Sequence, residues 1–280
     1  MDLSNENVIH VKKDGVEYLQ FRRLLEYNNI ITHAYTLGVN ISFKTDAFDK
    51  TFLPPTELKK VLNNYKKICS SLGTDYKRVV KTRQEHTKNI AIVNKKINID
   101  KPDINLEEYA NIDGFITNNP NLILTTTNAD CILFLLFDPV KRVIANIHSG
   151  WSGTLQEISV EAIKKMIQDY GCNPKDIICC MCPSIRKCHF EVEEDIAERF
   201  YNKFKSLEKI NEIIEHNSNT NKWNIDTVLI NKIILKNIGL KPENIIDSGI
   251  CSVCNSNIIH SFRVEKEKFG HAIALIELKK

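Results

Sequence analysis

The chain has 280 residues, of which 42% are hydrophobic and 26% charged, as in globular proteins that bury a core. Its formal net charge of +3 is too small to indicate nucleic acid or a membrane surface as a partner. The longest uninterrupted apolar run, Cys131 to Phe137, is far shorter than the roughly 20 residues of a membrane helix. No leader-like segment opens the sequence, so we expect a cytoplasmic protein whose nine cysteines are thiols or metal ligands rather than disulfides.

The first part of the chain alternates short apolar segments with polar turns. Residues 18–21 and 30–35 are predicted strands, and a helix that contains Val61, Tyr65 and Ile68 is expected to end before Gly73. Residues 78–81 and 90–93 are predicted strands on either side of a connection that carries His86. A further strand is expected at residues 115–117, after a turn at Asp113 and Gly114.

The central stretch predicts two buried strands, each with one reactive side chain. The first, residues 122–137, contains Cys131 within an apolar run, and the second, residues 142–148, ends at His148. A glycine-rich turn then leads to a helix expected from about Thr154 to Tyr170, with Gly171 as its C-terminal stop.

The last third of the sequence also contains both predicted strands and predicted helices. Strands are predicted at residues 176–182, 245–252, 260–264 and 271–278, and helices at 192–204 and 226–238. Strands and helices do not alternate strictly, so the pattern favours an α+β fold with a layered core in a single domain, residues 1–280.

Cys131 and His148 lie on neighbouring predicted strands. Both residue types are also common in protein cores, so simple packing is one interpretation. Asp130 beside the thiol, and a helix N-terminus after Gly153 that would favour an anion, indicate a functional site instead. A thiolate nucleophile with a histidine base is one possibility. If His86 joins them, the set has the three ligands of a catalytic zinc site.

Other residues carry weaker signals. Cys179 to Cys182 and Cys251 to Cys254 each form a C-x-x-C pair, but 68 residues separate the pairs, so a shared structural metal is the less favoured interpretation. Cys172 and Cys188 are assigned to packing. Arg263, on the predicted strand 260–264, offers a planar guanidinium for phosphate or carboxylate.

Several motifs together resemble the YfiH-like laccase-domain family. They are Thr127-Asn128-Ala129-Asp130-Cys131, His148-Ser149-Gly150-Trp151-Ser152-Gly153-Thr154, Gln84-Glu85-His86, Cys182-Pro183-Ser184-Ile185 with Cys188 and Phe190-Glu191-Val192, and Ser261-Phe262-Arg263. They occur in the family's order.

The resemblance implies a sandwich of mixed β-sheets flanked by helices, in α/β/β/α layers. It implies one zinc ion held by His86, Cys131 and His148, with copper as a possible substitute. It also implies phosphorolysis of adenosine, inosine, guanosine and methylthioadenosine and deamination of adenosine, with purine nucleosides and phosphate as partners and no obligate protein partner. We expect the catalytic residues to be Cys131, His148 and Asp130, the last as acid or base. Arg263, His33 and Gln84 are expected to contact the substrate.

The sequence departs from the family pattern at three places where an arginine is usual. Ser152, Leu37 with its neighbours, and His271 supply no such cation, which bears on phosphate binding. Laccase chemistry is not expected, because the chain has eight histidines and no H-x-H pair. Two alternatives stay open: a metal-free cysteine hydrolase or deamidase that uses Cys131 and His148, and a zinc- or nucleoside-binding protein without turnover.

Overall fold

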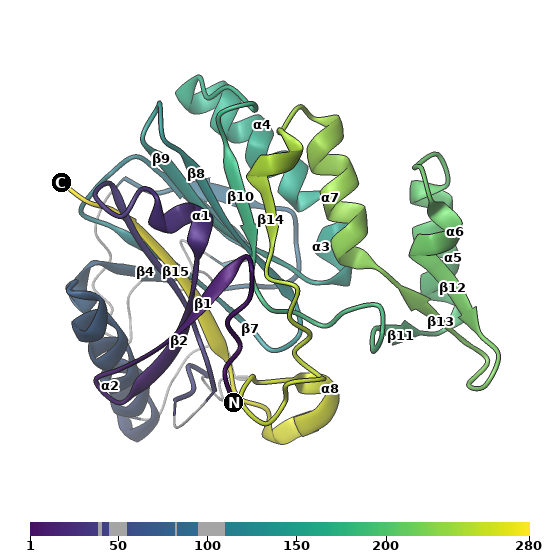
Figure 1. Ribbon diagram of the computed structural model, residues 1–280, viewed down its shortest axis with the longest axis horizontal. Coiled ribbons are helices and arrows are strands. Elements are labelled where there is room, and N and C mark those ends of the chain that lie inside the picture. The colour runs from purple at the N-terminus through teal and green to yellow at the C-terminus, as the bar shows by residue number, and fades with distance from the viewer. Residues whose placement is uncertain (39–40, 45–54, 82, 95–109) are drawn as a thin grey trace.

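The computed structural model describes residues 1–38, 41–44, 55–81, 83–94 and 110–280 (Figure 1). Two six-stranded sheets form its centre. The first sheet has the strand order β1-β2-β3-β15-β7-β4, and only β4 and β7 are parallel neighbours in it. Its strands are β1 (Val8–Lys13), β2 (Val16–Phe21), β3 (Ile31–Thr36), β4 (Val79–Lys81), β7 (Ile123–Asn128) and β15 (Ala272–Leu278).

The second sheet has the order β14-β10-β8-β9-β6-β5. Its β10–β14 and β5–β6 pairs are parallel and the other pairs are antiparallel. Its strands are β5 (Ile90–Ile92), β6 (Gly114–Thr117), β8 (Ile132–Asp138), β9 (Val143–Ser149), β10 (Ile178–Met181) and β14 (Ile245–Asp247).

The apolar runs of the sequence follow from burial of both faces of these sheets. On β8, Leu133 and Leu135 enter the core between the two sheets, whereas Phe134 and Leu136 enter the core beneath the helices. Because neighbouring side chains of a strand point to opposite faces, a strand covered on both sides reads as a continuous apolar run.

Helices cover the outer faces of the sandwich (Figure 1). Helix α2 (Pro55–Leu72) packs against the first sheet through Val61, Tyr65 and Ile68, as the helical spacing predicts. Helices α4 (Ile158–Tyr170) and α7 (Thr227–Asn237) cover the second sheet. The predicted α+β fold with α/β/β/α layers is therefore confirmed. Among the described residues, no helix is long and apolar enough to cross a membrane.

A smaller unit extends to one side of the sandwich (Figure 1). Its sheet has the order β11-β13-β12, and the helices beside it contribute Phe200, Phe204 and Ile213 to a separate apolar cluster. The unit contains β11 (Glu191–Val192), α5 (Glu194–Phe204), α6 (Ile210–Ile213), β12 (Ile214–Asn217) and β13 (Lys222–Ile225). The remaining short elements are α1 (Arg22–Leu25), η1 (Tyr76–Arg78), α3 (Trp151–Leu155), η2 (Pro242–Asn244), α8 (Phe262–Glu265) and η3 (Lys266–Lys268).

Four predicted elements are wrong in form. The strand expected at residues 245–252 ends at Asp247. The strand expected at residues 122–137 is two strands, β7 and β8, which belong to different sheets. The helix expected from Thr154 begins at Trp151 and is broken by the left-handed backbone of Glu157 into α3 and α4. The strand expected at residues 260–264 is the short helix α8, whose first turn is capped by the Ser261 side chain.

Candidate metal centre

Cys131 lies at the corner where the chain passes from the first sheet to the second. β7 ends at Asn128 and β8 begins at Ile132. Asp130 makes this turn with φ of 87°, in the left-handed region that residues other than glycine seldom adopt. Asn128 stabilises the corner, because its side-chain amide donates to the carbonyl oxygens of Cys131 (2.6 Å) and Pro183 (3.0 Å). The apolar run of the sequence therefore folds into a bend that presents the thiol at a strand end.

His148 lies beside Cys131 because β8 and β9 are antiparallel neighbours. Their register pairs Leu133 with His148, two residues along from the thiol. The His148 ring is 3% exposed. Its Nδ1 lies 2.8 Å from Oδ1 of Asp113, so this nitrogen donates to the carboxylate and Nε2 is directed elsewhere.

Asp113 was not recognised in the sequence as more than a turn residue, and it organises both histidines. Besides His148, its carboxylate accepts hydrogen bonds from the backbone amides of Glu85 (3.2 Å), His86 (3.1 Å) and Thr87 (2.7 Å), and from the Thr87 hydroxyl (2.7 Å). Burial raises the Asp113 pKa, but the hydrogen bond and charge of His148 and the hydrogen bonds from Thr87 outweigh it and lower the pKa. One carboxylate thus fixes the His148 ring and the turn that carries His86.

His86, Cys131 and His148, here called the strand-end cluster, bring three potential ligand atoms together. The Cys131 Sγ and His86 Nε2 atoms are 3.8 Å apart, and all three ligand atoms lie within 4.8 Å of one another. Gly150 closes one side. A Cβ atom at this position would lie 2.6 Å from His86 Cδ2 and 3.2 Å from Cys131 Sγ, so only glycine fits without displacing a ligand.

The electrostatics of the cluster favour a charged pair. Burial raises the pKa of the Cys131 thiol, but the charge of His148 and hydrogen bonds from both histidines outweigh it and lower the pKa to about 6. Burial lowers the pKa of His148, whereas the negative charges of Cys131 and Asp113 raise it to about 9. Without a metal, the pair is therefore thiolate and imidazolium at neutral pH.

Asp130 and Arg263 are joined to each other. The Asp130 carboxylate accepts hydrogen bonds from the Ser252 hydroxyl (2.6 Å) and from the Arg263 backbone amide (2.7 Å). The Arg263 Nη1 group donates to the carbonyl oxygens of His189 (3.0 Å) and Glu191 (3.2 Å). Both carboxylate oxygens of Asp130 are thus engaged, one with Ser252 and the other with the segment that carries the Arg263 guanidinium.

The two other residues expected to contact substrate have internal partners. His33 is 1% exposed, its Nε2 accepts from the Phe21 amide at 2.8 Å, and burial lowers its pKa to about 3. A neutral ring in this position has almost no surface for a substrate, so we assign His33 to the core. The Gln84 side chain pairs with the Thr127 backbone through both its oxygen and its nitrogen, each at 2.7 Å, and thereby ties the His86 segment to β7.

Several positive side chains act on His271, at a position where the resemblance implies an arginine. Burial is the largest cause that lowers the His271 pKa to about 3, and the charges of Lys81, His260, Lys44 and His148 add to it. Burial also lowers the pKa of Lys81 to about 8. Lys81 ends β4, beside the strand that leads to Cys131, so positive charge is available at this edge without the missing arginines.

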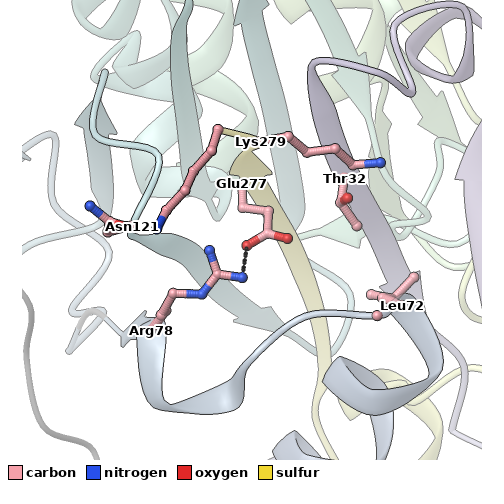
Figure 2. A pocket seen from close by; sticks show the side chains of 8 residues that line it. Thr32, Leu72, Arg78, Asn121, Glu277 and Lys279 are labelled. Atoms are coloured by element: carbon pink, nitrogen blue, oxygen red, sulfur yellow. Dashed lines mark ion pairs between the residues drawn. The ribbon is translucent and has the colours of Figure 1, made fainter.

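The described residues include the linings of two cavities. One, of about 490 Å³, lies at the far end of β15, where Arg78 and Glu277 form an ion pair of 3.1 Å (Figure 2). Ala272, at the opposite end of this strand, pairs with Asn128 next to the strand-end cluster. The first cavity is therefore remote from the ligands. The other, of about 500 Å³, is lined by residues that include Lys44, His260 and Phe269.

Curated relatives cover most of this chain at low identity. A purine nucleoside phosphorylase of Bacteroides thetaiotaomicron is 26% identical over 274 residues, which are 98% of this chain and 100% of that protein. An adenosine deaminase of an unknown prokaryotic organism is 28% identical over 207 residues, 73% of this chain and 76% of that protein. A purine nucleoside phosphorylase of Mus musculus is 26% identical over 223 residues, 78% of this chain. The chain spans about half the length of this mouse relative (48%).

Solved structures and a family model agree with these matches. The YlmD protein of Geobacillus stearothermophilus superposes with a TM-score of 0.77 over 100% of both chains at 17% identity. The YfiH protein of Bacillus licheniformis gives 0.76 over 94% of this chain and 96% of that one, at 24% identity. Both show the same fold. Residues 52–279 match the family model described as multi-copper polyphenol oxidoreductase laccase, so the chain belongs to that family; its relatives include proteins named purine nucleoside phosphorylase and adenosine deaminase.

Proposed function

We propose that this protein is a zinc-dependent purine nucleoside enzyme that phosphorolyses adenosine, inosine, guanosine and methylthioadenosine and deaminates adenosine. The observation that carries the proposal is the strand-end cluster, in which three ligand atoms converge in front of Asp113. The names of the relatives support the substrate class. The family's description as a laccase gives less support to oxidase chemistry in this chain, because the cluster contains only two of the chain's eight histidines.

The donor atoms fit zinc. One thiolate and two imidazoles are ligands that zinc accepts, and three protein ligands leave a fourth position for water or substrate. In a tetrahedral site with zinc–sulfur and zinc–nitrogen distances of ~2.3 and ~2.0 Å, sulfur and nitrogen would lie ~3.6 Å apart. The observed Cys131 to His86 distance is 3.8 Å. Asp113 behind His148 adds the carboxylate–histidine arrangement that commonly supports a metal ligand.

A zinc ion bound here would supply Lewis acidity beside the reacting purine. The chain's own part is to hold the groups in place. Asp113 accepts the hydrogen bond of His148 Nδ1 and so orients the ring with Nε2 toward the cluster, and Gly150 leaves room next to His86 and Cys131. In deamination, the oxygen of a water molecule bonds to C6 and the C6–N6 bond breaks. The amino group takes one proton from that water and leaves as ammonia. In phosphorolysis, a phosphate oxygen bonds to C1′ as the bond to the base nitrogen breaks, and that nitrogen gains a proton.

Phosphate is proposed to bind near Arg263 and Lys81. The Arg263 backbone amide donates to Asp130, which adjoins Cys131, so the segment that carries the guanidinium is tied to a neighbour of the cluster. Lys81 and its neighbours near His271 add positive charge at the same edge of the first sheet. A planar guanidinium can bind two phosphate oxygens at once, which suits a substrate that must be oriented toward C1′. We propose that Asp130 acts by positioning Arg263 rather than as the acid or base.

The test uses purified, zinc-loaded protein with adenosine, in the presence and absence of phosphate, and separates the products by chromatography. Inosine without phosphate reports deamination, and adenine with ribose 1-phosphate reports phosphorolysis. The Cys131→Ala variant is expected to lose both. Arg263→Lys is expected to raise KM for phosphate and to leave deamination unchanged. If zinc-loaded protein forms no product from any of the four nucleosides, the proposal is wrong.

A metal-free cysteine hydrolase is the second candidate, because the thiolate and imidazolium pair of Cys131 and His148 is the form that such enzymes use. The two candidates differ in their response to chelators. Removal of metal abolishes turnover of nucleosides under the zinc proposal, whereas the hydrolase becomes more active as its thiol is released. A protein that binds zinc and nucleoside without turnover would show binding by calorimetry and no product in either assay.

A further inference from the structure

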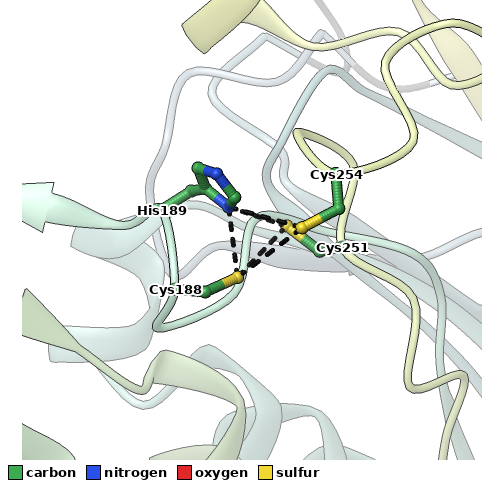
Figure 3. A group of neighbouring side chains, drawn as sticks. All are labelled: Cys188, His189, Cys251 and Cys254. Carbon is green, nitrogen blue, oxygen red and sulfur yellow. Dashed lines mark hydrogen bonds between the residues drawn. The ribbon is translucent and has the colours of Figure 1, made fainter.

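A second group of sulfur and nitrogen atoms lies outside the strand-end cluster. Cys188 and His189 come from one turn, and Cys251 and Cys254 come from another (Figure 3). Their ligand atoms all lie within 4.8 Å of one another. These four residues are here called the turn cluster. Packing, to which we assigned Cys188, is wrong for this thiol, because Cys188 and Cys254 are exposed.

The distances within the turn cluster match a tetrahedral zinc site. The Cys188 Sγ atom lies 3.7 Å from Cys251 Sγ and 3.9 Å from Cys254 Sγ. The His189 Nδ1 atom lies 3.1, 3.7 and 3.5 Å from the sulfur atoms of Cys188, Cys251 and Cys254. Tetrahedral zinc would place sulfur atoms ~3.8 Å apart and sulfur and nitrogen ~3.6 Å apart. The distance between His189 Nδ1 and Cys188 Sγ is shorter than this, and the other measured distances need little adjustment.

The local backbone explains why the four side chains converge. Near Cys188, the amides of His189 and Phe190 both donate to the Arg186 carbonyl oxygen at 2.8 Å, which makes a tight turn. Near Cys251, the Asn255 amide donates back to the Cys251 carbonyl oxygen at 3.2 Å, so the C-x-x-C segment also turns. A bridge between Ser184 and Cys251 holds the two segments side by side.

The other C-x-x-C pair shows the contrast. Cys179, Cys180 and Cys182 are completely buried at the β10 strand and its end. Cys180 and Cys182 enter the core between the sheets, whereas Cys179 enters the core beneath the helices. Because the strand points Cys179 and Cys182 to opposite faces, they cannot bind one ion together. The two pairs therefore do not share a metal, and only Cys251 and Cys254 belong to a ligand set.

We propose that Cys188, His189, Cys251 and Cys254 bind a second, structural zinc ion. Three thiolates and one imidazole in a tetrahedral arrangement are a common structural zinc set, and four protein ligands leave no position for water or substrate. The site joins two turns whose neighbours reach the strand-end cluster. Ser252, between the two cysteines, donates to Asp130, and Arg263 donates to the carbonyl oxygen of His189. The second zinc therefore fixes the frame that holds Arg263.

The experiment measures metals per chain by mass spectrometry in full-length protein purified with reductant and without chelator. We expect two zinc ions in the wild type, one in Cys131→Ala, one in Cys254→Ser and none in the double variant. Asn257→Ala, a change at an exposed residue just beyond Cys254, is the matched control and should keep both. Cys254→His supplies another zinc ligand and should also retain two, which separates loss of a ligand from damage to the turn.

Spectroscopy gives a second readout that does not depend on activity. Cobalt at a three-thiolate site produces a stronger sulfur-to-metal charge-transfer band than cobalt at a one-thiolate site. The band should fall by more than half in Cys254→Ser and by less than half in Cys131→Ala. In zinc-loaded protein, Cys188 and Cys254 should resist alkylation despite their exposure, and a chelator should make them reactive.

Each failure has its own meaning. One zinc in the wild type that is lost in Cys131→Ala and kept in Cys254→Ser would overturn the second site and leave the proposed function intact. A disulfide between Cys188 and Cys251 or Cys254 in reduced preparations, or iron in place of zinc, would also overturn it. One zinc that is lost only in Cys254→Ser would support the second site and remove the metal from the proposed function.

Discussion

The strand-end cluster and the turn cluster use similar side chains on different supports. The strand-end ligands come from a strand, a sheet corner and a turn held by Asp113, and His148 is 3% exposed. The turn ligands come from two short turns, and two of the four are exposed. Three ligands next to the two sheets leave an open position for chemistry, whereas four ligands on turns are saturated and hold the chain together. The support, more than the residue type, separates the two roles.

The largest effect is expected for Asp247→Ala, which weakens the structure around the turn cluster. The Asp247 carboxylate accepts hydrogen bonds from Nη1 and Nη2 of Arg186, each at 2.6 Å. Arg186 begins the turn that carries Cys188. Asp247→Ala leaves a half-buried guanidinium unpaired, so we expect a loss of about 3 kcal/mol in the free energy of unfolding. Urea denaturation measures it. Asp169→Ala, which removes an exposed pair with Lys165, should cost under about 0.5 kcal/mol, and equal losses would contradict the prediction.

The same pair predicts an acid dependence. Burial raises the pKa of Asp247, but hydrogen bonds and charge from Arg186 outweigh it and lower the pKa to about 2. A carboxylate with a lowered folded pKa stabilises the protein above its unfolded pKa of about 4. This contribution should therefore disappear as the pH falls from about 4 to about 2. Unfolding curves of wild type and Asp247→Ala should converge over that interval, and parallel curves would rule the contribution out.

Asp113→Asn tests the support of the strand-end cluster. The amide keeps the size of the carboxylate but loses its charge and can no longer accept from every donor. Loss of a group that orients a metal ligand usually weakens affinity by about 10- to 100-fold. Competition with a chromogenic chelator should show this loss for the zinc bound by Cys131 and none for the zinc of the turn cluster. Asp138→Asn, at the other end of β8, is the control, and an equal effect there would argue against a specific role.

Gly150→Ala should have a smaller effect at the same place. The added methyl group would lie 2.6 Å from His86 Cδ2, so the imidazole must move. Overpacking of this kind costs ~1–3 kcal/mol, and we expect roughly a tenfold loss in zinc affinity at the strand-end cluster with an unchanged circular dichroism spectrum. Ser152→Ala in the same short helix should bind zinc like the wild type. Unaltered affinity in Gly150→Ala would show that His86 is not a ligand.

The smallest effect concerns the metal-free thiol. Because the pKa of Cys131 is lowered to about 6, its alkylation rate in chelated protein should rise with a midpoint near pH 6 and level off above pH 7. A thiolate of low pKa is also a weaker nucleophile, so at pH 7 the rate should exceed that of an ordinary thiol by only about fourfold. Iodoacetamide labelling with peptide mass spectrometry follows this one site. A midpoint near pH 9 would mean that His148 does not stabilise the thiolate.

Sequence reasoning proposed the three residues that meet in the strand-end cluster, but not the groups that hold them. Cys131 and His148 were recognisable because each lies at one end of a mostly apolar segment. Asp113 resembled any turn aspartate, since its five donors come from segments that only the folded sheets bring together. The sheet change at Asp130 depends on a positive φ that no residue type signals there. His189 and Cys251 are 62 residues apart, which hides the turn cluster from any spacing rule.

The hydrogen bonds of Asp113 also bear on how the protein acquires its metal. Because they fix His148 and the His86 turn through protein contacts alone, the ligand geometry of the strand-end cluster exists before an ion arrives. Capture of an ion then requires no folding step, and one divalent metal can replace another without rebuilding the site. Among such metals copper(II) binds nitrogen and sulfur ligands more tightly than zinc. We therefore expect excess copper(II) to displace the zinc proposed for this centre.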